Sequence, residues 1–377
     1  MSIESVKTLL EKDPEMFQTP CFVYVPELVE RNYQSLREAI GTDLIISVKA
    51  NHCIDLLTLI SSGKDGFEAA SESELSILTM AKGHYSFVNS PGLTAAMVRK
   101  AVGAKAQLVV DHPEQVALLA PYRERLKPVM LRVHPSALLE LEPRQKVGHF
   151  GMDWQGLCSA IDALRELEIP VAGLHCFQGS YSFQKRAIAT VSAMEGLAQR
   201  VEERLGYALT ILNLGGGFGP SWQTEDFDFE GYRERLIPMQ ARYQLLHEAG
   251  RAIFATAGCF LTRVVSVKTL GQQRYAVCDG GIAQNFLLAQ TESPFSRPFS
   301  PQFWPTSGDK KQQDIRTTLV GSSCNKDDVI GQVDGQAALP AIGDIALYPM
   351  CGAYNRTYSP VDFLGLAKAR EYIVHEA

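Results

Sequence analysis

Short apolar runs rich in β-branched residues recur along the first two thirds of the chain, and each has the length of a buried strand. The segments between them, such as PEQVALLAPYRERL (113–126), repeat apolar residues every three or four positions, which is typical of amphipathic helices. The eight runs are LIISVKA (44–50), GFEAAS (66–71), YSFVNS (85–90), AQLVVD (106–111), PVMLRVH (128–134), PVAGLHCF (170–177), LTILNLG (209–215) and YQLLHE (243–248). Parallel strands need a crossover, so strands that alternate with helices predict a parallel sheet. Eight such units predict a closed (β/α)8 barrel, an α/β fold of the TIM-barrel type.

The pattern changes after about residue 260. Strand-like segments then follow one another, separated by glycine, proline and polar turns, with few helical stretches between them. This pattern predicts a second domain, an antiparallel β-sandwich or β-barrel. Residues 295–314, rich in proline and polar residues, are predicted to form an exposed insertion between two of its strands.

The composition agrees with a globular enzyme-sized protein. Apolar residues make up 46% of the 377 residues, and the formal net charge is −6. No basic run could follow a phosphate backbone, so we expect no nucleic-acid partner. No apolar stretch approaches the roughly 18 residues of a membrane span, and no signal segment is visible, so we expect a cytoplasmic protein with no membrane partner.

The eight cysteines are scattered along the chain. The closest two, Cys158 and Cys176, are too far apart for a CxxC zinc or redox motif. Scattered cysteines in a long chain are typical of a reducing compartment, and no metal site is predicted.

Reactive groups of a barrel lie at the carboxyl ends of its strands, and Lys49 directly follows the apolar run LIISV. A strand-end lysine can simply reach solvent. An amine that its strand keeps partly from water is more often uncharged, and it can then attack a carbonyl carbon. Lys49 is therefore a candidate for Schiff-base chemistry.

Three further strand ends carry candidate anion-binding groups. The glycine run Gly215–Gly217 follows TILNL, where backbone N–H groups can approach a phosphate, although Pro220 breaks the GxGxxG pattern and a flexible turn is the alternative. Glu248 and Arg251 form either a surface ion pair or a carboxylate facing a ring nitrogen with a guanidinium on an anion. Ser180 would add a hydrogen bond to the same anion.

The second domain contributes two candidates. Cys324 lies in the polar segment GSSCNKDD. Most cysteines are buried among apolar residues, so these polar neighbours are unusual and make Cys324 a candidate. Tyr354 lies in CGAYN, where its hydroxyl would either reach an anion or be satisfied within the core.

Taken together, the motifs SVKAN, GFEAASESEL, HCFQGS, LNLGGGFG, EAGR, CNKDD and GAY resemble those of the fold-type III pyridoxal-phosphate decarboxylases, in the same order. This group includes diaminopimelate, ornithine and carboxynorspermidine decarboxylases, and the resemblance extends over nearly the whole chain. It implies an alanine-racemase-like fold. Residues 27–258 would form a barrel that binds pyridoxal 5′-phosphate, and residues 1–26 with 259–377 would form the β domain.

The resemblance also implies a role for each candidate residue. Lys49 would bind the cofactor covalently, and Glu248 would hydrogen-bond its pyridine nitrogen. Cys324 of the neighbouring subunit in an obligate homodimer would protonate the α-carbon, so the active sites would lie at the dimer interface. The other cofactor-binding residues would be Glu68, Arg132, Phe177, Ser180, Gly215, Gly216, Gly217, Arg251 and Tyr354, and the substrate-binding residues would be Asn325 and Asp328.

Three positions depart from the family pattern. Phe177 stands where the family has a histidine stacked on the cofactor ring, and it can stack but cannot relay a proton. Asn325 replaces an acid that helps recognise a distal amine, and EAGR replaces EPGR. We therefore predict an α-decarboxylase of an amino acid or an amino-acid conjugate, of the kind found in siderophore and other secondary pathways.

Three other functions compete with this prediction. An amino-acid racemase of the same fold typically faces the ring nitrogen with arginine, where this chain has Glu248. A non-catalytic cofactor-binding homologue would not need both Lys49 and Cys324. A lysine-dependent sugar-phosphate aldolase would leave the second domain and the CNKDD loop unexplained.

Overall fold

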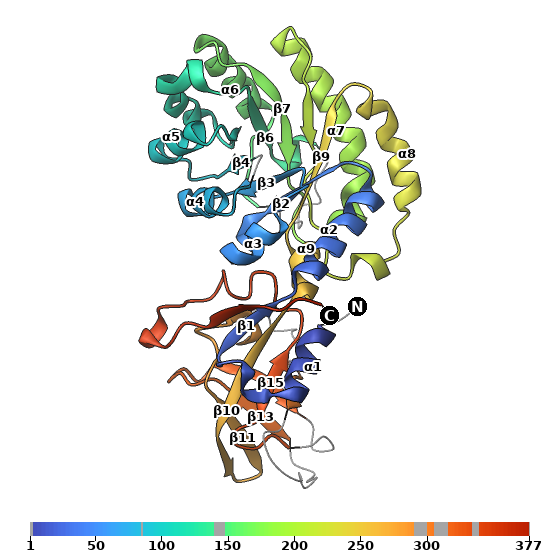
Figure 1. Ribbon diagram of the computed structural model, residues 1–377. Coiled ribbons are helices and arrows are strands. Elements are labelled where there is room, and N and C mark those ends of the chain that lie inside the picture. Colours follow the sequence, from blue (N-terminus) through green and yellow to red (C-terminus); the bar gives the residue numbers. More distant parts are fainter. Residues whose placement is uncertain are drawn as a thin grey trace. The chain divides into compact units, whose positions relative to one another are not determined.

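The computed structural model describes residues 3–83, 86–138, 148–289, 300–304, 316–333 and 339–376. The chain divides into two compact units (Figure 1). The first, which we call the barrel unit, comprises residues 31–252, and the second, the β unit, comprises residues 1–30 and 253–377. The sequence-based boundaries were residues 27 and 258.

The barrel unit is built on a closed barrel in which, over the described residues, eight parallel strands pair in chain order. Each strand corresponds to one predicted run. The strands are β2 (Asp43–Ser47), β3 (Gly66–Ala69), β4 (Ser86–Asn89), β5 (Gln107–Val110), β6 (Val129–Val133), β7 (Val171–Cys176), β8 (Ile211–Asn213) and β9 (Gln244–Ala249). The last strand closes the barrel on the first, with Glu248 of β9 opposite Ile45 of β2.

Helices connect the strands and surround them (Figure 1). They are α2 (Pro26–Ile40), α3 (Ile54–Ile60), α4 (Glu72–Met80), α5 (Ala95–Gly103), α6 (Trp154–Glu166), α7 (Phe183–Leu205) and α8 (Phe229–Gln240). The helix expected over 113–126 is instead a 3-10 helix, η3 (Pro113–Arg125), in which Pro121 has no N–H to donate. No helix in the described ranges is both long and apolar enough to cross a bilayer.

Apolar side chains from the strands fill the interior of the barrel, because alternate residues of a strand point to the same side. The buried cluster consists of Ile45, Phe87, Val109, Met130, Ala172, Ile211 and Leu246. Gly173 allows β7 and β8 to approach closely, since a Cβ at this position would lie 1.9 Å from the Ile211 carbonyl oxygen. The polar residues at the strand ends are therefore supported by a packed apolar core.

The β unit contains an eight-stranded sheet in its described part, with the path β12-β15-β10-β11-β13-β14. Strand β1 adds to β10, and β16 adds to β1. The strands are β1 (Cys21–Tyr24), β10 (Gly258–Leu270), β11 (Gln273–Cys278), β12 (Gln302–Trp304), β13 (Thr317–Val320), β14 (Val329–Val333), β15 (Ile345–Tyr348) and β16 (Arg370–Ile373). Three short α-helices accompany these strands, α1 (Glu4–Lys12), α9 (Arg251–Phe254) and α10 (Phe286–Ala289).

Two features of this sheet differ from the sequence-based expectation. The sheet is mixed rather than antiparallel, because β11 pairs with β13 and β1 pairs with β16 in parallel. The predicted insertion, 295–314, includes strand β12, which pairs with β15. Most of the remaining insertion lies outside the described residues.

Replacing Met130 by alanine is expected to lower the free energy of unfolding of the barrel unit by about 2–5 kcal/mol. Met130 is fully buried in the barrel interior, and its neighbours can fill the resulting cavity only in part. Urea denaturation followed by circular dichroism measures the change. Leu59→Ala, on an exposed position of α3, is the matched control and should change the value by less than about 0.5 kcal/mol. Equal losses in the two variants would contradict the assigned core.

Candidate active site

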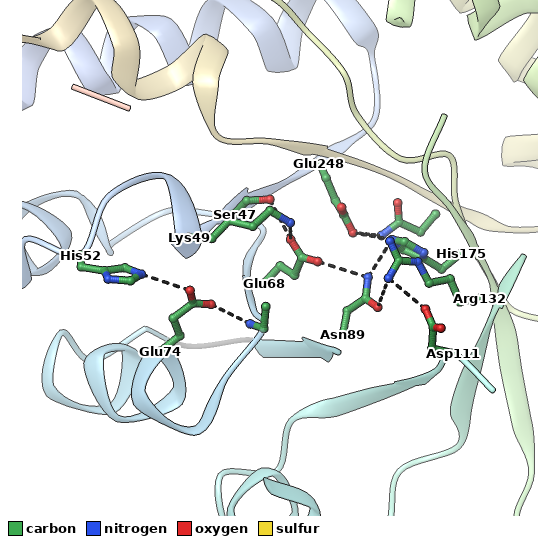
Figure 2. Close-up of polar contacts among 12 residues, drawn as sticks. Ser47, Lys49, His52, Glu68, Glu74, Asn89, Asp111, Arg132, His175 and Glu248 are labelled. Atoms are coloured by element: carbon green, nitrogen blue, oxygen red, sulfur yellow. Dashed lines mark hydrogen bonds and ion pairs between the residues drawn. The ribbon is translucent and has the colours of Figure 1, made fainter. Parts of the chain in front are cut away.

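Lys49 lies at the carboxyl end of β2, in the short 3-10 turn Val48–Ala50, and its amine is paired with a carboxylate (Figure 2). Lys49 Nζ is 3.0 Å from Glu68 Oε2, which also accepts a hydrogen bond of 2.8 Å from Ser47 Oγ. The Glu68 side chain is 2% exposed, whereas that of Lys49 is 45% exposed. The expected desolvation of Lys49 is therefore only partial, and a buried carboxylate holds an amine that stays accessible.

Asn89, at the end of β4, continues the polar network from Glu68 into the barrel (Figure 2). Its Nδ2 donates to Glu68 Oε1 over 3.2 Å, and its Oδ1 accepts from Arg132 Nη1 over 3.2 Å. The orientation of the amide follows from these partners, because a carboxylate only accepts and a guanidinium only donates. Asn89 thus links the Lys49–Glu68 pair to the arginine on β6.

Arg132 is buried, and its charge is balanced within the barrel. Its Nη1 is 3.0 Å from Asp111 Oδ2, which also accepts from the Gly151 backbone N–H over 3.1 Å. The guanidinium carbon lies 4.6 Å from the centre of the Phe150 ring. These contacts fix the guanidinium in one position, as a buried cation requires.

Glu248 is a buried carboxylate on β9, inside the same rim. Its Oε1 lies 2.9 Å from His175 Nε2 and accepts a hydrogen bond of 2.8 Å from Asn213 Nδ2. Burial alone would raise the pKa of Glu248, but electrostatic attraction by His175 and Lys49, together with the hydrogen bonds, lowers it to about 2. The carboxylate is therefore ionised at neutral pH and can face a protonated ring nitrogen.

His175 on β7 lies between Glu248 and Asn89 (Figure 2). Its Nε2 is 2.9 Å from the Glu248 carboxylate and 3.3 Å from Asn89 Nδ2. One ring nitrogen cannot donate to an ionised carboxylate and also accept from an amide. We therefore assign the proton to Nε2, which donates to Glu248.

The glycine run after β8 packs against the ends of two neighbouring strands. A Cβ at Gly215 would lie 2.3 Å from the Cys176 carbonyl oxygen of β7, and one at Gly216 would lie 2.2 Å from the Glu248 carbonyl oxygen of β9. Gly215 and Gly217 have φ angles of +76° and +94°, which favour glycine. No other residue could bring the backbone so close, as an anion cradle requires.

The turn after β7 borders the glycine run. A Cβ at Gly217 would lie 2.5 Å from the Gly179 carbonyl oxygen. Ser180, which is exposed, is the residue after Gly179 and therefore lies close to the glycine run. Phe177 is half-buried, and its Cα would lie 3.3 Å from a Cβ at Gly215. Arg251 begins α9, just beyond the end of β9. The predicted phosphate-binding residues of the barrel unit therefore come from adjacent strand ends.

The other predicted site residues belong to the β unit. Cys324 is exposed, and Asn325 Oδ1 accepts from the Asp327 N–H over 3.0 Å in the loop between β13 and β14. Tyr354 is half-buried, with a φ angle of +66°.

Asp328 differs from the expectation of a substrate ligand. Its side chain is buried and accepts hydrogen bonds from the Ile282 N–H over 2.7 Å and from Ser323 Oγ over 2.6 Å. The carboxylate therefore shapes the loop of Cys324. Direct contact with a substrate would require these bonds to be replaced, so the structure favours an architectural role.

Sequence reasoning missed several residues of the site. His52 Nε2 lies 3.1 Å from Glu74 Oε1, and Glu74 Oε2 accepts from the Ala70 N–H over 2.6 Å (Figure 2). This pair connects the segment after Lys49 to the start of α4. The sequence did contain a sign of Glu74, because an acid three residues after Ser71 is the pattern of a helix capping box. Asn213 and Ser47 carried no comparable signal.

The arrangement suits pyridoxal 5′-phosphate. It offers an accessible amine for the aldehyde, a buried ionised carboxylate for the ring nitrogen and a glycine-lined cradle beside an arginine for the phosphate. A closed barrel with this donor set, in a chain with a second β unit, defines the class of pyridoxal-phosphate enzymes with a barrel and a β domain.

The chain belongs to the pyridoxal-dependent decarboxylases, since residues 27–262 match the family model described as the pyridoxal binding domain of pyridoxal-dependent decarboxylases. It is 25% identical to the L-glutamyl-acyl-carrier-protein decarboxylase of Niallia circulans, over 93% of this chain and 87% of the relative. It is 26% identical to the 2-((L-alanin-3-ylcarbamoyl)methyl)-2-hydroxybutanedioate decarboxylase of Staphylococcus aureus, over 92% of each chain. Other relatives are named diaminopimelate decarboxylase.

Solved structures show the same fold. The lysine/ornithine decarboxylase of Vibrio vulnificus, solved with putrescine, superposes with a TM-score of 0.81 over 99% of both chains, at 21% identity. The protein is therefore a pyridoxal-phosphate-dependent decarboxylase, as the motifs predicted. The relatives named here are all decarboxylases, and nothing in them favours the racemase or aldolase alternatives.

Glu248 should make part of the stability of the protein dependent on pH. Its pKa is about 2 in the folded chain, below the ordinary value of 4.5, so its contribution is present above pH 4.5 and is lost as the pH falls toward 2. The unfolding free energy of the wild type minus that of Glu248→Gln should therefore shrink across this window. Urea titrations of both proteins at several pH values measure it, with Asp55→Asn on α3 as the exposed control. A constant difference would contradict the assigned ionisation.

Proposed function

We propose that the enzyme removes the α-carboxylate of an amino acid whose distal end is acylated or carboxylated rather than a free amine. The observation that carries this proposal is Asn325, which stands where the family resemblance expects an acid for a distal amine. An asparagine offers no charge to an ammonium group but can hydrogen-bond an amide or a carboxylate. The substrates in the names of the Niallia and Staphylococcus relatives carry their amino acid in acyl linkage, which supports the same substrate class.

In this proposal the residues of the barrel rim, together with Tyr354 of the β unit, hold the cofactor. Lys49 holds the cofactor through Nζ, and Glu68 keeps that amine in place when it is released. Glu248 holds a proton on the ring nitrogen, with His175 and Asn213 fixing the carboxylate. Phe177 covers the ring face. The phosphate is bound by Ser180, Gly215, Gly216, Gly217, Arg251 and Tyr354.

The reaction breaks the bond between Cα and its carboxylate and releases CO2. Bound pyridoxal phosphate supplies an electron sink for the pair left at Cα. The protein must then deliver one proton to Cα, and the Cys324 thiol is the proposed donor, which solvent recharges. Phe177 has no proton to give, so the residue at this family position cannot do it, and the proposal assigns the task to Cys324.

The proposed active enzyme is a homodimer with its sites at the subunit interface, and the loop of Cys324 and Asn325 enters the site of the partner. The support is that Cys324 is exposed on a loop whose shape Asp328 fixes, which suits a side chain presented to another subunit. We place the enzyme in the cytoplasm, in a siderophore or other secondary pathway. None of the eight cysteines forms a disulfide in the described part of the chain, which agrees with a reducing compartment.

A substrate panel tests the proposed function. Loss of 44 Da, followed by mass spectrometry, should be at least about tenfold faster (in kcat/KM) for amino acids with an acylated or carboxylated side-chain end than for lysine or ornithine. Asn325→Asp should gain lysine or ornithine turnover, because the new carboxylate keeps the acceptor for the Asp327 N–H and adds a charge for the amine. Asn325→Ala is the control for disturbance of the loop. Faster turnover of free diamino acids by the wild type would contradict the proposal.

Complementation tests the shared active site. Lys49→Ala and Cys324→Ala should each lose most activity as pure homodimers. Mixing and reassociating the two variants should restore activity, because one site of each mixed dimer then has both Lys49 and Cys324. Each pure variant, taken through the same dissociation and reassociation, is the control. No recovery, although mass spectrometry shows that mixed dimers have formed, would rule out the exchange of this loop.

A further inference from the structure

Tyr181 follows Ser180 in the turn after β7, and nothing in the family resemblance assigns it a role. Its backbone is in the left-handed region, with a φ angle of +57°, and its side chain is 57% exposed. Only two aromatic residues in the described ranges have such a φ, Tyr181 and Tyr354. A bulky residue in this region is strained, and it persists only where the surroundings fix it.

The Tyr181 ring contacts Arg251 and approaches the chain just after the glycine run. Its centre lies 5.1 Å from the guanidinium carbon of Arg251, within the range of a cation–π contact. A Cβ at Gly219, two residues after Gly217, would lie 3.4 Å from Cδ1 of the ring. The ring is therefore in reach of both the guanidinium and the segment that follows the glycine run.

The turn that carries Tyr181 is tied down on both sides. Ser182 Oγ donates to the Gly179 carbonyl oxygen over 2.6 Å, and Arg186 Nη1 donates to the Gln178 carbonyl oxygen over 2.7 Å. The same Gly179 carbonyl oxygen packs against Gly217. These contacts hold the left-handed turn in place beside the cradle.

Core packing does not explain Tyr181, because more than half of its side chain is exposed. Nor does turn geometry, since glycine or asparagine would adopt this φ with less strain. The tyrosine instead places a flat aromatic ring against the guanidinium of Arg251.

We propose that Tyr181 is a positioning residue that holds the Arg251 guanidinium toward the cofactor phosphate. The ring restricts the rotamers of Arg251 before the phosphate arrives, so less conformational entropy is lost on binding. It also covers the guanidinium from water, which strengthens its hydrogen bonds to an anion. This inference rests on the proposed role of Arg251 as a phosphate ligand.

The test compares two ligands of the apoprotein, pyridoxal 5′-phosphate and pyridoxal, which has no phosphate group. Titration by absorbance and intrinsic fluorescence gives both dissociation constants. Tyr181→Leu should weaken pyridoxal 5′-phosphate about tenfold and leave pyridoxal unchanged, whereas Tyr181→Phe, which keeps the ring, should stay within about twofold of the wild type. Tyr207, an exposed tyrosine four residues before β8, accepts a hydrogen bond from the Val171 N–H at the start of β7, and Tyr207→Leu should change neither constant.

A double-mutant cycle separates this inference from the role of Arg251. If Tyr181 acts through the guanidinium, Tyr181→Leu should have little further effect on phosphate affinity in an Arg251→Gln background. Equal weakening of both ligands, no weakening, or full additivity with Arg251→Gln would overturn the inference while the role of Arg251 stands. If Arg251→Gln leaves the ratio of the two constants unchanged, the proposed role of Arg251 fails, and the role of Tyr181 fails with it.

The backbone strain gives a second readout that does not depend on ligand. Tyr181→Gly should raise the melting temperature of the apoprotein, because glycine adopts the left-handed φ without strain, and should weaken pyridoxal 5′-phosphate as Tyr181→Leu does. A lower melting temperature with unchanged affinity would mean that Tyr181 serves only the fold.

Discussion

The site depends on one ionised carboxylate kept away from water. Glu248 is buried in the barrel, and burial opposes its charge, so the charge survives only because His175 and Asn213 donate to the same oxygen and Lys49 adds its field. A neutral acid at this position could not favour a protonated ring nitrogen. The ionisation of Glu248 therefore depends on two neighbouring side chains, His175 and Asn213, that hold its carboxylate from behind.

Glu68 is a second carboxylate with a different setting and a different task. It is as buried as Glu248, but it pairs with an exposed amine, so it can hold Lys49 when that residue is not bound to the cofactor. Asn89 contacts both arms, through Glu68 on one side and His175 on the other. The two carboxylates thus lie in separate hydrogen-bonded groups, which meet where Asn89 contacts His175.

The sequence predicted what depends on local pattern. All eight barrel strands were predicted, because short β-branched runs that alternate with amphipathic segments fit few other folds. Lys49, Glu248 and the glycine run lie at the strand ends where the sequence placed them. The bonds of His175 and Asn89 were not predictable, since they depend on which side chains meet across the barrel. Asp328 looked available for substrate because sequence does not show which backbone N–H groups a loop carboxylate accepts from. The parallel pairing of β11 with β13 was not predicted for a similar reason, because the sequences of the strands do not show the order in which they pair.

The pairing of β2 with β9 has a consequence for how the enzyme matures. Lys49 follows the first strand of the barrel and Glu248 lies on the last, about 200 residues apart in sequence, and they come together only at the seam where the barrel closes. A nascent or truncated chain that lacks β9 keeps Glu68 beside its amine, but it lacks the second acid, Glu248, and the partner edge for β2. The full set of charged groups at this rim is therefore assembled only when the last strand of the barrel joins the first.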